Sequence, residues 1–148
     1  MKHYFFLFLT FLGLAACDDC SSVTENLQSV RVRFRSQTDG SFIDTTIASV
    51  EGVGSNQPLL FTEEERYSEI VLPLLTSEPE TIFIINYDSL NADTLLFEYV
   101  VRAIPLPPDC GVDEEITELK VPIATLDSLV ILHSTLLNVN EYDMEIYY

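Results

Sequence analysis

The sequence predicts an all-β protein: an antiparallel β-sandwich of about seven to nine strands, with a small open β-barrel as the alternative. Two observations support this prediction. Apolar and polar residues alternate with a period of two, most clearly over residues 30–35 and 142–148, which is the pattern of half-buried strands. Breaks rich in Gly, Asn, Asp and Pro separate short apolar runs at regular intervals, as they do in sandwiches and barrels.

The first predicted strand buries Val30, Val32 and Phe34 and ends at a hairpin turn of residues 37–40, where Asp39 suits the turn. Further apolar or β-branched runs predict strands at about 42–50, 68–74, 80–87, 94–103, 117–123 and 128–137, followed by a last one near 142–148.

Two segments interrupt this pattern of strands. Residues 104–111 contain three prolines, which donate no hydrogen bond to a sheet, so we expect a rigid connection there. Thr62 to Arg66 is the one segment that resembles the start of a helix, of one turn at most.

The amino terminus has the features of a bacterial lipoprotein signal peptide. A charged start and an apolar run from Tyr4 to Leu14 precede the tetrapeptide Leu14-Ala15-Ala16-Cys17. The run is shorter than the roughly 20 residues that a membrane-spanning helix needs. We therefore expect cleavage before Cys17 and a lipid on its sulfur. The predicted organisation is a signal peptide at 1–16, a lipid anchor with a short acidic tether at 17–29, and a single β-rich domain at 30–148.

Composition limits the partners. Seven Lys and Arg stand against 24 Asp and Glu, giving a formal net charge of −17. Nucleic acid is excluded as a partner because phosphate binding depends on Lys and Arg. A hydrophobic content of 47% indicates that the acidic domain nevertheless folds. Because so acidic a domain has little attraction to anionic lipid, we expect the protein to contact the membrane through its N-terminal lipid.

Cys20 and Cys110 remain as a pair once Cys17 carries the lipid, and export favours a disulfide between them. Cys20 lies three residues from Cys17, so the bridge would hold the domain within about 10 Å of the anchor. The alternative, a redox or metal site at Cys17-Asp18-Asp19-Cys20, lacks a βαβ context and further ligands. No metal or cofactor is expected.

An ordered set of features suggests a family. The set is the lipobox cysteine, the acidic residues after it, a second cysteine, Val30-Arg31-Val32-Arg33-Phe34, Leu72-Pro73-Leu74, a strand from Thr81 to Tyr87, Asp93-Thr94-Leu95, a strand at Tyr99, and Cys110-Gly111. It resembles a family of small Bacteroidetes lipoproteins recorded as a domain of unknown function, over most of residues 17 to 148. The resemblance implies an outer-membrane or periplasm-facing, β-rich lipoprotein, and it supplies no catalytic residues.

Candidate catalytic groups are few. His133 lies in an apolar run without a Gly-x-Ser-x-Gly elbow, so a strand histidine is a better interpretation than a catalytic base. Asp113, Glu114, Glu115 and Glu118 could serve glycoside hydrolysis or hold calcium, but a solvated acidic loop explains them more simply. We expect no catalytic residues and a protein that is not an enzyme, with a hydrolase as the lowest-ranked alternative.

The most unusual placement is the row of Arg31, Arg33 and Arg35 on one face of one strand. One interpretation is a salt-bridged sheet face, with partners such as Glu98 or Glu145. The other is a docking face for an anionic ligand, such as a phosphorylated lipid headgroup or an acidic glycan. The function expected is a non-enzymatic interaction or structural module of the cell envelope, with an envelope protein as partner. The expected location is the outer membrane, with its periplasmic and surface faces left open.

Overall fold

A computed structural model of the protein describes residues 28–54, 59–60, 66–88, 90–105, 112–136 and 141–148. All regular structure in these residues is β-strand. The strands are β1 (Ser29–Arg35), β2 (Thr45–Thr46), β3 (Ser49–Gly52), β4 (Leu59–Leu60), β5 (Arg66–Tyr67), β6 (Glu69–Pro73), β7 (Glu80–Asn86), β8 (Ala92–Pro105), β9 (Val112–Ala124), β10 (Ser128–Ile131) and β11 (Met144–Tyr147).

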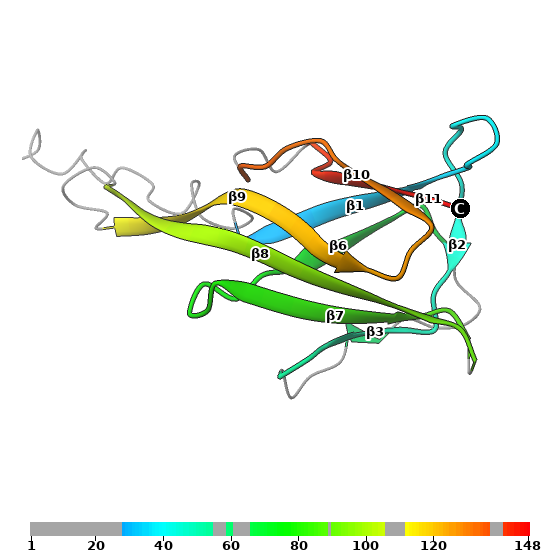
Figure 1. Ribbon diagram of the computed structural model, residues 1–148, viewed down its shortest axis with the longest axis horizontal. Helices are drawn as coiled ribbons and strands as arrows, with labels where there is room; N and C mark the ends of the chain where they lie inside the picture. The colour runs from blue at the N-terminus through cyan, green and yellow to red at the C-terminus, as the bar shows by residue number, and fades with distance from the viewer. Residues whose placement is uncertain (1–27, 55–58, 61–65, 89, 106–111, 137–140) are drawn as a thin grey trace, which may run out of the picture.

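The strands form two layers and a small third sheet (Figure 1). Sheet A is four-stranded, in the order β10-β11-β1-β6, and sheet C is five-stranded, in the order β4-β3-β7-β8-β9. Strands β2 and β5 pair as a two-stranded sheet. None of the three sheets closes into a barrel, so the predicted all-β sandwich is confirmed and the barrel alternative is not. The described residues contain eleven strands, more than the expected seven to nine, and three of them, β2, β4 and β5, are only two residues long.

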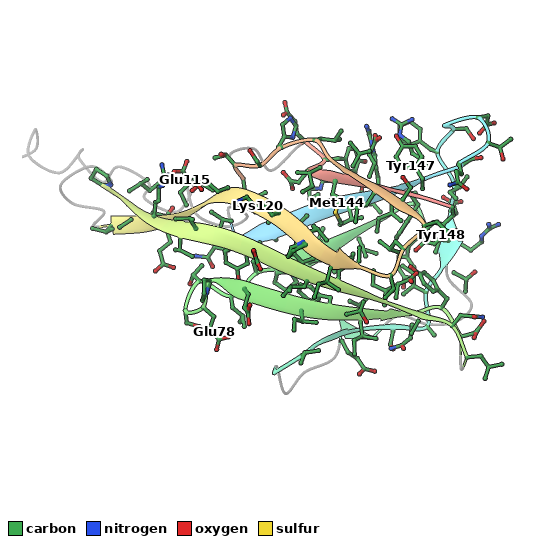
Figure 2. All side chains as sticks on the ribbon, in the orientation of Figure 1. Glu78, Glu115, Lys120, Met144, Tyr147 and Tyr148 are labelled. Atoms are coloured by element: carbon green, nitrogen blue, oxygen red, sulfur yellow. The ribbon has the colours of Figure 1, made fainter. Side chains whose placement is uncertain are left out.

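The core lies between sheets A and C. Val30, Val32 and Phe34 of β1 are fully buried, while the arginines between them face outward. Figure 2 shows Met144 of β11 pointing between the layers, whereas Glu78 lies on the outside. The other residues that fill the core from both sheets include Ile70, Leu72, Val50, Phe83, Ile85, Leu95, Phe97, Ile116, Leu119 and Ile146.

One pairing departs from the predicted antiparallel arrangement. Strand β11 lies between β10 and β1, antiparallel to the first and parallel to the second. A parallel pair needs a long connection between its strands, and here most of the domain separates Val32 from its partner Met144. The sandwich is thus antiparallel except at β1 and β11.

Strand boundaries also differ from expectation. The run predicted at 42–50 is broken into an isolated bridge between Phe42 and Arg35, then β2 and β3. Strand β9 begins at Val112, well before the predicted 117, because its acidic residues pair through the backbone with the end of β8. The four acidic residues are therefore part of a strand and do not form a loop. The predicted helical turn at 62–66 falls mostly outside the described residues.

Candidate functional site

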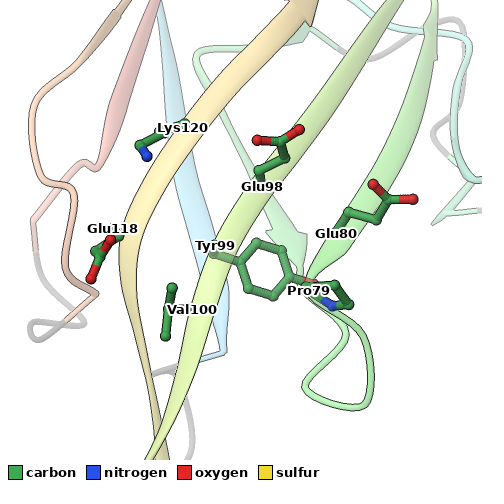
Figure 3. Close-up of a pocket in the computed structure, with 7 residues that line it drawn as sticks. All are labelled: Pro79, Glu80, Glu98, Tyr99, Val100, Glu118 and Lys120. Carbon is green, nitrogen blue, oxygen red and sulfur yellow. The ribbon is translucent and has the colours of Figure 1, made fainter.

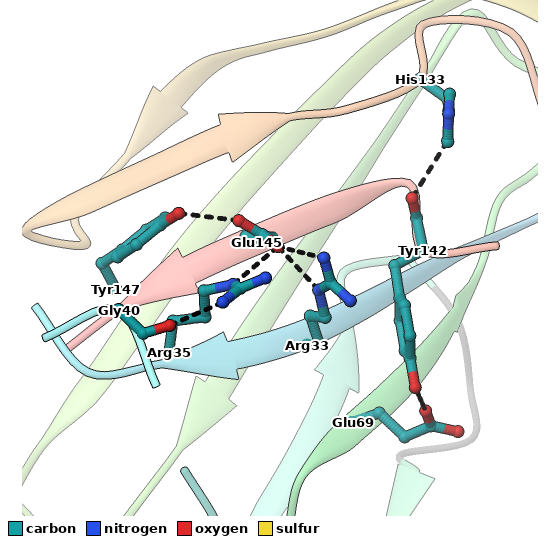
Figure 4. Close-up of polar contacts among 8 residues, drawn as sticks. All are labelled: Arg33, Arg35, Gly40, Glu69, His133, Tyr142, Glu145 and Tyr147. Atoms are coloured by element: carbon teal, nitrogen blue, oxygen red, sulfur yellow. Dashed lines mark hydrogen bonds and ion pairs between the residues drawn. The ribbon is translucent and has the colours of Figure 1, made fainter. Parts of the chain in front are cut away.

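The arginine row lies on the outer face of sheet A. Arg31, Arg33 and Arg35 alternate with the buried residues of β1, so all three project away from the core. Arg31 pairs with Glu69 of β6 at 3.0 Å. Arg33 and Arg35 both donate to Oε1 of Glu145 on β11, each through Nε at 2.7 Å (Figure 4). Each arginine of the row thus has a carboxylate partner.

Two aromatic rings contact the guanidinium groups, and each ring lies against two of them. The Tyr142 ring centre is 5.1 Å from the guanidinium carbon of Arg31 and 4.6 Å from that of Arg33. The Phe42 ring centre is 4.9 Å from Arg33 and 4.4 Å from Arg35. These contacts connect Arg31, Tyr142, Arg33, Phe42 and Arg35 in that order, and the five residues are here called the arginine ladder.

The carboxylates of the ladder are held ionised. A hydrogen bond from the Tyr142 hydroxyl, at 2.6 Å, and one from Arg31 lower the pKa of Glu69. Burial acts to raise the pKa of Glu145, but hydrogen bonds from Tyr147, Arg35 and Arg33 outweigh it and hold that pKa below its usual range. Glu145 is only 5% exposed, so its charge depends on these donors.

The ladder bears on both interpretations of the row. Glu145 is a partner, as predicted, but Glu98 is not: it lies on sheet C, opposite Glu80 and Lys120. The two rings were missed from sequence. Both rings fall in runs that the sequence predicts as strands, at 42–50 and 142–148, and nothing in those runs marks a contact with arginine. Tyr142 reaches β1 because Asp143, which directly precedes β11, bonds to the backbone of Arg31.

Apolar side chains surround the ladder on the same side of the molecule. Phe42 is 61% exposed although two guanidinium groups stack on it. Val71 of β6 and Val130 of β10 lie at outward positions in register with Arg31 and Glu145, and are 44% and 43% exposed. The outer face of sheet A therefore combines arginine, tyrosine and phenylalanine with exposed valines on a rigid sheet.

His133 is exposed and lies just beyond β10. Its Nδ1 contacts the carbonyl oxygen of Tyr142 at 3.0 Å, and its Nε2 lies 3.5 Å from Oε2 of Glu141. Within the described part of the chain no serine hydroxyl contacts it. The arrangement of a nucleophile, base and acid that a triad needs is not assembled among these residues.

Asp143 is a second buried carboxylate of this region, 4% exposed. Its Oδ2 accepts a hydrogen bond from the backbone N–H of Arg31 at 2.8 Å. Burial raises the pKa of Asp143, and this hydrogen bond offsets only part of the effect. The contact joins β11 to β1, and the carbonyl of Asp143 also accepts from the backbone of Leu132 at 2.7 Å. Its role in the fold is to tie three strands together.

The acidic residues of β9 do not converge on one point. Glu118 pairs with Arg102 at 2.9 Å, and both side chains are more than half exposed. Asp113 is buried, with Oδ2 free of any hydrogen bond. The described residues contain no cluster of three or more side chains that could hold a metal ion.

A groove of about 330 Å³ crosses the outer side of sheet C near the start of β7 (Figure 3). Glu80 and Glu98 lie directly opposite each other on its rim, with Lys120 beyond. The Tyr99 ring forms part of the lining, and its hydroxyl donates to the carbonyl of Leu75 at 2.6 Å. With three glutamates against one lysine, the lining disfavours an anionic ligand.

The expected lipidation site and disulfide fall on residues that the structure does not describe. Cys17, Cys20 and Cys110 are outside the described residues, as is the segment 1–16. No described segment forms a helix with the length and apolar character to cross a bilayer.

Comparison with known proteins identifies a family without an assigned activity. No curated protein and no solved structure matches the chain. Residues 44–148, well over half of the sequence and most of both large sheets, match a family of unknown function, DUF6452. The chain belongs to this family.

Proposed function

We propose that the protein is an exported, lipid-anchored protein of the bacterial cell envelope, and that its sandwich is a non-enzymatic module that binds a protein partner. The lipobox Leu14-Ala15-Ala16-Cys17 supports export and anchoring, with a disulfide between Cys20 and Cys110 beside the anchor. The resemblance to Bacteroidetes lipoproteins supports an outer-membrane location.

The observation that carries the binding role is the arginine ladder. Arginine, tyrosine and phenylalanine are the residue types enriched in the cores of protein interfaces. The ladder holds its side chains in place before a partner arrives, so less conformational entropy is lost on binding. In a chain with a net charge of −17, it is also the place where basic groups gather.

The sheet edges favour docking on this face. Strand β6 is a short edge strand that ends at Pro73, which cannot donate to an added strand. The outer edge of β9 is bonded to the segment after β10, through Leu119 to Ser134 at 2.9 Å and Leu136 to Ile116 at 3.0 Å. Addition of a partner strand is thus hindered at one edge of each large sheet, which favours docking on a face over strand addition at these two edges.

The alternative use of the row, as a site for an anionic glycan or lipid headgroup, has weaker support. The three guanidinium groups already share two carboxylates, those of Glu69 and Glu145, so only one positive charge is left without a matching negative charge. An anionic ligand would have to displace these carboxylates or share their donors.

The test is crosslinking and recovery of the lipidated protein from intact cells, with Phe42→Ser as the variant of the face. Phe42 is largely exposed, so the substitution leaves the core intact, and Leu90→Ser, at a 91% exposed position on the turn before β8, is the matched control. A partner lost with Phe42→Ser and kept with Leu90→Ser supports the proposal. If the partner is lost with Cys17→Ala but kept with Phe42→Ser, the lipid positions the domain and binding by the ladder is refuted. If no partner is recovered, the proposal that the sandwich is a protein-binding module is refuted.

A further inference from the structure

Strands β8 and β9 continue beyond the end of the sandwich as a two-stranded ribbon. Glu98 is the last residue of β8 that pairs with β7, and the Tyr99 N–H then donates to the carbonyl of Pro79 at 3.0 Å. From Val100 to Pro105, β8 pairs with β9 alone, down to the final pair of Pro105 and Val112. Figure 1 shows this ribbon extending past the neighbouring strands on the side where β1 begins.

One face of the ribbon carries three exposed apolar residues that no described strand covers. Val112 is 69% exposed, and its partner Pro105 and the nearby Ala103 are also exposed. These residues continue the face of β8 that buries Leu95 and Phe97 farther along, where sheet A covers it. In the ribbon, the side of sheet C that faces the core therefore continues beyond the part that sheet A covers.

The sequence places this ribbon near the lipid. Val112 is two residues from Cys110, the proposed partner of Cys20, and Cys20 is three residues from Cys17. At about 3.3 Å per residue and about 5.5 Å between bridged Cα atoms, Val112 lies within roughly 22 Å of the lipidated residue. The ribbon end is therefore the part of the described structure closest to the anchor along the covalent chain.

We infer that the end of the β8–β9 ribbon docks on the bilayer that holds the anchor, with Val112, Pro105 and Ala103 contacting the lipid interface. This inference rests on the proposed function, because the anchor and the disulfide bring the ribbon to the membrane. Glu114 pairs with Ala103 on this same face, Glu115 pairs with Arg102 on the other face, and both glutamates are half-buried. Their carboxylates would meet the ammonium groups of phosphatidylethanolamine favourably and anionic headgroups unfavourably. The lipid surface that fits is therefore zwitterionic.

The absence of tryptophan from the chain allows a direct test. Val112→Trp and Leu90→Trp each place one indole at an exposed position, at opposite ends of β8. Both lipidated proteins are incorporated into phosphatidylethanolamine–phosphatidylcholine vesicles with brominated acyl chains. Docking predicts a blue-shifted emission for Val112→Trp and quenching several-fold stronger than for Leu90→Trp. Replacing phosphatidylethanolamine with phosphatidylglycerol should reduce the quenching at low salt.

The outcomes separate this inference from the proposed function. If both variants float with the vesicles but are quenched equally, the protein is anchored and the ribbon does not dock. If anionic lipid strengthens the quenching, the acidic end does not face the lipid and the inference fails. If neither lipidated variant floats with the vesicles, anchoring itself is refuted, and the inference falls with it.

Discussion

Glu145 connects more of the arginine ladder than any other carboxylate. One of its oxygens accepts from both Arg33 and Arg35, and the other accepts from Tyr147 at 2.7 Å. Removing its charge leaves two guanidinium groups close together and partly buried, with side chains 19% and 23% exposed. We expect Glu145→Gln to lower the free energy of unfolding by about 2 to 4 kcal/mol. Urea denaturation at neutral pH measures this change.

The matched control is Glu78→Gln, which removes a carboxylate from an exposed loop position. Because the pKa of Glu145 is lowered in the folded protein, its contribution is present above the ordinary glutamate pKa and is lost as pH falls through the folded value. The difference in free energy of unfolding between the parent and Glu145→Gln should therefore become smaller at acidic pH. Equal unfolding midpoints for Glu145→Gln and Glu78→Gln at neutral pH would contradict the role given to Glu145.

Asp143 has the opposite dependence on pH. Burial raises its folded pKa, so its contribution to stability is present below the ordinary aspartate pKa and is lost as pH rises through the raised value. At neutral pH its ionised form is therefore unfavourable in the fold. Asp143→Asn keeps an oxygen that can accept the Arg31 N–H and removes the charge. We expect this variant to be at least as stable as the parent at pH 7, measured by urea denaturation.

Asp143→Ala is the informative comparison, because it leaves the Arg31 N–H without its acceptor. A loss of about 1 to 3 kcal/mol is expected for that variant. If the asparagine variant lost as much stability as the alanine variant, the negative charge of Asp143 would itself be needed for the fold.

At the scale of the strand, the bulge in β9 concentrates backbone strain in one residue. The register between β8 and β9 shifts between Glu98 and Val100, and Glu118 there has a φ of 56°, in the left-handed region. That conformation costs a residue with a Cβ roughly 1 kcal/mol, and glycine avoids the cost. The Arg102 pair compensates little because both side chains are more than half exposed. We expect Glu118→Gly to raise the free energy of unfolding by up to about 1 kcal/mol in thermal or urea denaturation.

Glu118→Ala serves as the control for this prediction, since it also loses the ion pair but keeps the Cβ. It should be no more stable than the parent. A glycine variant less stable than the alanine variant would show that the bulge is held by the glutamate side chain and is not strained.

How far the sequence predicts each strand depends on what its side chains contact. Strands β1, β6 and β7 lie close to their predicted bounds because alternate residues are buried in the core. The first part of β9 escaped prediction because Asp113, Glu114 and Glu115 pair through the backbone, on the ribbon beyond the sandwich. Alternation of side chains indicates which face of a strand is buried, and it does not indicate the neighbouring strand.

The same limit explains what was missed at the site. The row of arginines is visible in the sequence, and the excess of acid made carboxylate partners expected. The position of Glu145 beside Arg33 follows from the parallel register of β1 and β11, which joins residues far apart in the chain. Tyr142 comes to the row through the pairing of β11 with β1, and no local spacing marks it as a ring partner. Phe42 lies opposite Arg35 across the turn at 37–40, so the predicted hairpin is the signal that could have placed this ring beside the row.

At the scale of the whole molecule, the two proposed surfaces lie on different parts of the sandwich. The ladder occupies the outer face of sheet A, and the ribbon extends from sheet C at the end where β1 begins (Figure 1). Docking of the ribbon on the bilayer would leave the ladder free to face a partner. The net charge of −17 would at the same time disfavour contact of the rest of the domain with anionic lipid.

The fold depends on β11, because this strand joins β10 to β1 within sheet A. Strand β11 lies between β10 and β1, and it supplies the buried Met144 and Ile146 as well as Glu145. Removing residues 142–148 would expose β1 along one edge and open the core between the layers. We expect the shortened protein to lose cooperative unfolding in urea. Its β1 amides should also lose their protection from hydrogen exchange.

The control for this truncation is Tyr147→Ala in the full chain, which shortens an outward side chain and keeps the strand. That variant should still unfold cooperatively, because the main-chain pairing of β11 with β1 and β10 remains. Cooperative unfolding of the truncated chain at an unchanged urea midpoint would mean that sheet C and the remaining strands form a stable unit alone. The parallel pairing of β11 with β1 would then not be required for a stable fold.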